Sequence, residues 1–304
     1  MAESRHEIKS KRATVTGNEQ AARELMTGTS KPAFAEIAEA DATGRTREIY
    51  DDFKASIGLP MVNLVYRHMA TTPGCLEWAW ALLRPHFVGG AMASAAEGLV
   101  ARLDLGETRP ITRDQLRGAG VDAAAQSVIS RTLDTYNRAN PMNLIALALL
   151  SREMKDHVFD GGDAPPETGP MPPRPISVVP PMANVSALPS ETQAVLGVLA
   201  TQAGIGGTAV MPTLYCHLTE WPGYLDIAVT VAARLVDNGS LDREASALRK
   251  GAHRAADQMP RYATDLPAPS ASQRNKLLGL IDLFPALIAR MIFIGVELRR
   301  SMPG

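Results

Sequence analysis

The sequence predicts an all-α protein in which two tandem homologous helical domains form a pseudo-two-fold dimer within one chain. Residues 58–69 (GLPMVNLVYRHM) and 207–218 (GTAVMPTLYCHL) share glycine, tyrosine and histidine in register, at an offset of 149 from residue 58 to residue 207. Solenoid units span about 20–50 residues, so a repeat at this distance indicates a duplicated domain. Alternating β-branched residues are rare, whereas the helix formers alanine, leucine and methionine are plentiful.

The repeat divides the chain into four segments. Residues 1–30 are polar, and residues 31–158 hold the first helical repeat. Residues 159–189 form a linker, because nine of the 22 prolines lie there and proline fixes φ and removes a hydrogen-bond donor. Residues 190–304 hold the second repeat. A chain of 304 residues accommodates two domains of this size.

The helices of the first repeat have recognisable ends. Residues 46–56 have the pattern of a helix that stops at Gly58, and the next helix carries His68. Asn140 and Pro141 are residue types of an N-cap and a first helical position, so we expect another apolar helix to begin there. Each repeat should contain about five or six helices.

The second repeat opens with a helix signal of its own. Ser190 and Gln193 have the spacing of a capping box, which predicts a helix from Ser190, and the glycines of residues 204–207 should end it. Apolar residues between 287 and 298 recur at helical spacing.

Composition limits the classes of partner. The 31 basic and 32 acidic residues give a net charge of −1, so nothing in the charge favours nucleic acid or an anionic membrane. Residues 1–11 are polar with no apolar stretch after them, which favours a cytoplasmic protein with reduced, buried thiols at Cys75 and Cys216. Neither thiol has a metal-ligand cluster around it, and residues 283–298 are too short and too charged to span a membrane.

A glycine-rich turn is the first candidate site. Gly206, Gly207 and Thr208 lie between two helices, where the backbone can approach a ligand closely and the next helix presents free N–H groups to an anion. The alternative is a plain interhelical turn. His68 and His217 hold equivalent repeat positions, and without a catalytic partner each is expected to bond a nearby carbonyl.

Aromatic and amide side chains form two further candidates. Tyr50 and Phe53 lie three residues apart on one helix face and line either a cavity or the core. Asn137, Asn140 and Asn143 follow one another at intervals of three, and an amide that faces the cleft between the repeats can orient a water or a carboxylate.

Four phrases resemble the group I 2-haloacid dehalogenases, an α-helical family that processes D- or DL-2-haloalkanoic acids. They are GLPMVNLVYRH (58–68), EWAW with LRP (77–85), YNRANPMNL (136–144) and PTLYCHL with WP (212–222). Their order and the internal duplication extend the resemblance over roughly residues 40 to 300.

The resemblance implies a pseudo-dimeric fold, a site between the halves, no metal or organic cofactor, and a homodimer that acts on a small 2-halocarboxylic acid. In this family an aspartate activates a water that displaces halide from the α-carbon with inversion and without an enzyme ester. The resemblance assigns the asparagine that holds this water to Asn137 or Asn140. It also assigns the aromatic wall of the pocket to Tyr50 and Phe53.

The family aspartate is missing from the matching turn, where Gly207 stands. A general base typically contributes about 10²–10⁴-fold to the rate, so its absence matters. Asp51, Asp52 or Glu220 are the carboxylates that could enter the site instead. Two alternatives follow: different chemistry on another short 2-substituted acid, or binding of such carboxylates without catalysis.

Overall fold

The computed structural model describes residues 35–156, 162–164, 178–204 and 211–303. In these ranges the regular structure is helical, apart from an isolated bridge between Asp163 and Tyr262. The all-α prediction is therefore confirmed. The first half contains α2 (Gly44–Ile57), α3 (Leu64–Met69), α4 (Cys75–Val88), α5 (Ala91–Val100), α6 (Arg113–Gly118) and α7 (Ala123–Asp156). The second half contains a 3-10 turn (Val185–Ala187), α8 (Ser190–Gln202), α9 (Thr213–Leu218), α10 (Pro222–Asp237), α11 (Ser240–Gln258) and α12 (Ala271–Ser301).

The helix bounds preserve the spacing of the sequence repeat. Helices α3 and α9 begin at residues 64 and 213, and α5 and α11 begin at residues 91 and 240, the same offset of 149. Helices α7 and α12 close their halves, and each contains one internal proline, Pro141 and Pro285. Among the described residues the order of helices thus recurs apart from α6, while the pseudo-two-fold relation of the halves in space stays a prediction.

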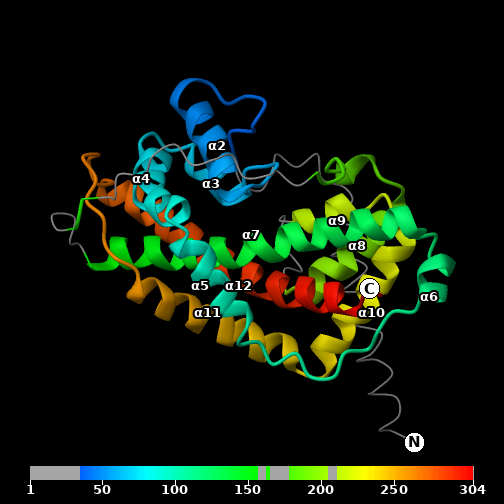
Figure 1. Cartoon of the computed structure of the whole chain (residues 1–304). Helices are drawn as coiled ribbons and strands as arrows, with labels where there is room; N and C mark the ends of the chain where they lie inside the picture. The colour runs from blue at the N-terminus through cyan, green and yellow to red at the C-terminus, as the bar shows by residue number, and fades with distance from the viewer. Residues whose placement is uncertain (1–34, 157–161, 165–177, 205–210, 304) are drawn as a thin grey trace, which may run out of the picture.

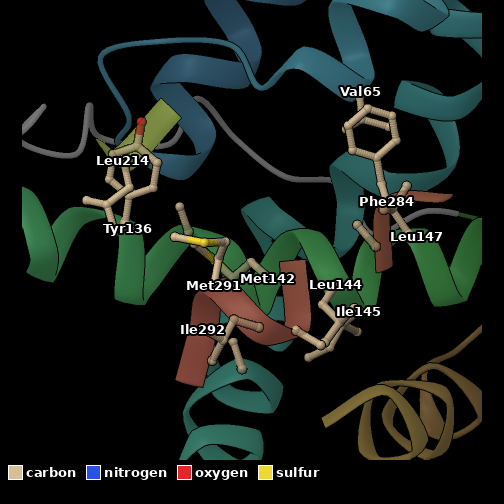
Figure 2. Packing of buried hydrophobic residues seen from close by; sticks show 14 of the residues in the cluster. Val65, Tyr136, Met142, Leu144, Ile145, Leu147, Leu214, Phe284, Met291 and Ile292 are labelled. Atoms are coloured by element: carbon tan, nitrogen blue, oxygen red, sulfur yellow. The ribbon is translucent and has the colours of Figure 1, made fainter. Parts of the chain in front are cut away.

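Helices α7 and α12 pack against each other through the middle of the molecule, and α11 packs against both (Figure 1). Their apolar side chains gather in one region, which Figure 2 shows for α7 residues such as Met142 and Ile145 and α12 residues such as Met291 and Ile292. Buried residues of both halves belong to this single cluster. The two repeats therefore share a core.

The expected helix start at Asn140–Pro141 is wrong, because α7 runs without interruption through Pro141. Proline at an interior position removes one backbone hydrogen bond and costs about 3 kcal/mol. Residues 139–150 of α7 are all buried, and this burial along α12 offsets the cost. Asn140 is consequently an interior residue of the helix and not its cap.

Two helix ends test the local signals. Gly58 ends α2 with φ of 71°, a conformation that favours glycine, and its N–H donates to Lys54 O at 2.8 Å, as the sequence predicts. Helix α8 begins at Ser190 as predicted, but the predicted capping box is wrong. Pro189 is the N-cap, and the side-chain amide of Gln193 donates to Leu188 O at 2.7 Å.

Helix α12 is long and apolar enough to cross a membrane, by length and composition alone. In the structure it packs against α7, α10 and α11, and half of its apolar window is buried. Glu297 on this helix is 1% exposed and pairs with Arg234 of α10 at 3.2 Å. These features are those of a core helix that also buries an ion pair.

Candidate functional site

A row of polar side chains on α7 marks the junction of the two halves. Tyr136, Asn140 and Asn143 are buried and lie at positions i, i+4 and i+7, so they share one helix face. The Tyr136 hydroxyl donates to Thr213 Oγ1 at 2.8 Å, at the start of α9 in the second half. The Tyr66 hydroxyl, from α3 in the first half, donates to Asn143 Oδ1 at 3.3 Å. We call these three α7 residues the α7 polar row.

The three asparagines of α7 have different environments. Asn137 is outside the row: its Nδ2 donates to Gly295 O of α12 at 3.0 Å, and a Cβ at Gly295 would collide with its Oδ1. Asn140 is 8% exposed and has no recorded hydrogen bond within the described part of the chain. Asn143 is 1% exposed and is bonded through its oxygen alone. Asn137 therefore joins two helices, while Asn140 keeps its amide available.

An aromatic cluster covers the first-half side of the row. The Phe53 ring lies 4.5 Å from that of Tyr66 and 5.5 Å from that of Trp80, measured between centroids. Tyr50 is also buried, and its hydroxyl donates to Ile37 O at 2.9 Å. Burial raises the pKa of Tyr50 to about 12, so its hydroxyl stays neutral. Tyr50 and Phe53 are core residues, and Phe53 stands one ring away from the polar row.

The turn before α3 is held by residues that no sequence motif indicated. Glu39 accepts a hydrogen bond from Val62 N at 2.7 Å, and Arg138 of α7 donates to Gly58 O at 2.7 Å. Arg67 pairs with Glu36 at 3.2 Å, and its charge partly offsets the raised pKa of both Tyr50 and Tyr136. A signal for Arg67 exists in the repeat, because the second copy has an apolar cysteine at this position.

Comparisons with known proteins agree on one kind of enzyme. The chain is 25% identical over 253 residues to a configuration-inverting 2-haloacid dehalogenase of Alcaligenes xylosoxydans xylosoxydans, covering 82% of each chain. It is 24% identical over 269 residues to an (R)-2-haloacid dehalogenase of Pseudomonas putida, covering 84% of this chain and 88% of that one. This chain is a relative of the 2-haloacid dehalogenases. No protein-family model matches the sequence.

Solved structures support the dehalogenase fold. A D-2-haloacid dehalogenase mutant in complex with D-2-CPA superposes with a TM-score of 0.75 at 20% identity, covering 88% of this chain and 95% of that one. A D-2-haloacid dehalogenase with L-LA gives a TM-score of 0.73 at 20% identity, covering 90% and 98%. The likeness extends over nearly the whole of both folds.

The structure does not describe the glycine turn that the sequence predicts as a binding site. Gly206, Gly207 and Thr208 lie outside the described residues. Thr213, which follows the turn at the start of α9, is bonded to Tyr136 of the polar row.

The alternative carboxylates are engaged away from the polar row. Asp52 accepts hydrogen bonds from Trp80 Nε1 and Arg84 Nε, both at 2.7 Å. Asp51 pairs with Lys54 at 3.3 Å, and Glu220 is exposed. Among the described residues, no hydrogen bond or ion pair joins any of these carboxylates to Asn140. The expectation that one of them enters the site has no support in the geometry.

The paired histidines are structural, as expected. Nδ1 of His68 lies 2.5 Å from Ala35 O, and Nδ1 of His217 lies 2.6 Å from Pro180 O. Burial lowers the pKa of His217, so that its ring stays neutral. Each imidazole ties its short helix to a non-helical segment earlier in the chain.

The two cysteines are buried, as the sequence predicts. Cys75 and Cys216 are free and buried, and burial raises the pKa of the Cys216 thiol to about 11. A group of His, Cys, Asp and Glu able to hold a metal ion is absent from the ranges that the structure describes.

Proposed function

We propose that the protein is a cofactor-independent hydrolase that displaces halide from a short 2-haloalkanoic acid, by direct attack of water at the α-carbon and with inversion. The observation that carries the proposal is the α7 polar row, which brings an unbonded amide, Asn140, to the junction of halves in a fold shared with dehalogenases. The relatives named for configuration-inverting and (R)-specific dehalogenation support the reaction class.

The roles proposed for the residues follow from their surroundings. Asn140, rather than Asn137, holds the attacking water, because the Asn137 amide is used by α12. We assign the apolar side of the pocket to Phe53 and Tyr50 on the resemblance, although both are packed in the core. Backbone amides of residues 206–208 hold an anionic part of the substrate, and Gly207 occupies the position of the family base; both assignments rest on sequence alone. We further propose a cytoplasmic homodimer.

The competing function is binding of small 2-substituted carboxylates without turnover. It is favoured by one observation: within the described residues, none of the candidate carboxylates contacts Asn140. Halide release from each enantiomer of 2-chloropropionate separates the two functions. The hydrolase reading predicts release from one enantiomer and 2-hydroxyacid of inverted configuration. Saturable binding of lactate with no halide release would instead support the binding protein.

Single-turnover reaction in ¹⁸O-labelled water tests the mechanism. Direct attack by water predicts label in the product 2-hydroxyacid and none in the carboxylates of the protein. Label in a protein carboxylate would require an ester intermediate and would refute the direct-water mechanism.

Gly207→Asp tests the missing base, with Gly206→Asp as its matched control. A carboxylate at the base position is expected to raise the rate of halide release by about 10²-fold or more, because general bases contribute about 10²–10⁴-fold. The control should stay near the original rate. Equal rates in the two folded variants would show that Gly207 does not occupy the base position.

A further inference from the structure

Asn143 presents a buried hydrogen-bond donor that nothing in the described structure uses. The side chain is 1% exposed, and its Oδ1 accepts from the Tyr66 hydroxyl at 3.3 Å. Its Nδ2 is fully buried and has no partner among the described residues. An unsatisfied buried donor is destabilising, and such groups in native proteins are rare enough to need an explanation.

Satisfying the tyrosine does not explain this asparagine. Tyr215 stands at the repeat position equivalent to Tyr66, and its buried hydroxyl has no partner among the described residues. The fold therefore tolerates a buried tyrosine without an amide beside it. On the same face of α7, Ala139, Ala146 and Leu147 are apolar and buried, so a leucine at position 143 would suit the packing. Neither consideration accounts for an asparagine at position 143.

The surroundings indicate which ligand this donor suits. The Tyr66 bond holds the amide oxygen, so the N–H group is the part left to bind. The Phe53 ring lies next to Tyr66 and the Trp80 ring lies next to Phe53, and ring edges carry partial positive charge. A buried, neutral N–H donor on an amide held by Tyr66 suits a weakly hydrated, polarisable anion better than a carboxylate, which prefers a charged partner.

We propose that Asn143 Nδ2 donates a hydrogen bond to the departing halide, and that Tyr66 is the positioning residue that fixes the amide. The inference rests on the proposed dehalogenation. The water oxygen bonds to the α-carbon as the carbon–halogen bond breaks, the bonding electron pair leaves with the halide, and the proton of the water passes to solvent. Negative charge grows on the halogen during this step, so the N–H bond is stronger in the transition state than in the bound substrate.

Asn143→Leu and Tyr66→Phe test the halide role, with Tyr215→Phe as the matched control. Asn143→Leu should lower kcat on 2-chloropropionate by about 10²–10³-fold, as loss of one transition-state donor does. The loss should be smaller on 2-bromopropionate, because bromide needs less help to leave, and inhibition by added bromide should weaken. Tyr66→Phe should shift both readouts in the same direction, and Tyr215→Phe should shift neither.

A purely structural role would leave the bromide-to-chloride rate ratio and the bromide inhibition unchanged in folded Asn143→Leu, and that result overturns the proposal. If the original protein releases no halide, the proposed function fails, and bromide binding measured by calorimetry then tests the subsite directly. Binding that Asn143→Leu abolishes and Tyr215→Phe keeps supports the subsite. Equal binding, or no binding, refutes it.

Discussion

At the scale of single residues, the side-chain amides of Asn137 and Asn140 are held differently. Asn140→Ala removes the proposed water-holding group and should lower kcat by about 10²-fold with little change in thermal unfolding. Asn137→Ala removes the side-chain donor to Gly295 O and should lower the free energy of unfolding by about 1 kcal/mol, with kcat nearly kept. Halide release and thermal melts measure both. If Asn137→Ala instead lowers kcat and Asn140→Ala lowers only stability, Asn137 is the residue that holds the water.

His86 gives the structure a pH dependence of known sign. It is 1% exposed, packs on Tyr262 with centroids 4.8 Å apart, and burial with the nearby Arg152 charge lowers its pKa from 6.5 to about 4. The unfolded chain therefore binds a proton more readily, and stability is lost as the pH falls from 6.5 toward 4, on the order of 2 kcal/mol.

His86→Gln, which stays neutral, isolates this effect. Urea unfolding of the original protein and the variant between pH 7 and pH 4 should show a steeper loss in the original protein. Parallel losses would mean that His86 takes no part in the acid sensitivity.

The sequence supports some residue assignments better than others. The structural roles of His68 and His217 follow from sequence, because a lone histidine needs only a nearby carbonyl. Choosing among the asparagines requires the phase of α7, which depends on the helix continuing through Pro141. The free amide of Asn143 also depends on Tyr66, a partner 77 residues away in the chain.

At the scale of elements, α7 and α12 approach closely where Asn137 meets Gly295. A methyl group at Gly295 would collide with Asn137 Oδ1, so Gly295→Ala should lower the free energy of unfolding by about 1–3 kcal/mol. Gly279→Ala is the matched control on the same helix. It has open space around it and should raise stability by about 0.5–1 kcal/mol through helix propensity.

Urea titrations of both glycine variants measure these changes. Adding Asn137→Ala to Gly295→Ala should recover part of the loss, because the collision is removed. A Gly295→Ala protein as stable as the control would contradict the close approach of the two helices.

Helix ends were predictable from sequence only where local chemistry decides them. Gly58 ends α2 through a left-handed conformation that glycine adopts without strain, and the sequence signal is sufficient. The helix start predicted at Pro141 is wrong, because the local preference of proline is outweighed by burial of the surrounding helix against α12. That packing joins residues far apart in the chain. The capping box predicted at Ser190 does not form, because Pro189 is the N-cap and Gln193 bonds to Leu188 O instead.

At the scale of the whole molecule, the two repeats are expected to be interdependent. The first half bonds the second through Tyr136 to Thr213, and through Ile111 N to Ser301 O at 2.7 Å. Asp134 pairs with Arg299 at 2.8 Å, again across the halves. The buried cluster contains residues of both α7 and α12, so separating the halves exposes apolar side chains worth about 1.5–3 kcal/mol each.

Residues 1–158 produced alone should therefore lack a cooperative unfolding transition, and so should residues 159–304. Mixing the two fragments should restore a cooperative transition and any halide release of the intact chain, because the α7 polar row contacts Thr213, through Tyr136, only in the assembled molecule. Circular dichroism during heating and a halide assay measure both outcomes. A sharp, independent transition in either fragment would mean that each repeat folds on its own core and that the shared α7–α12 packing is secondary.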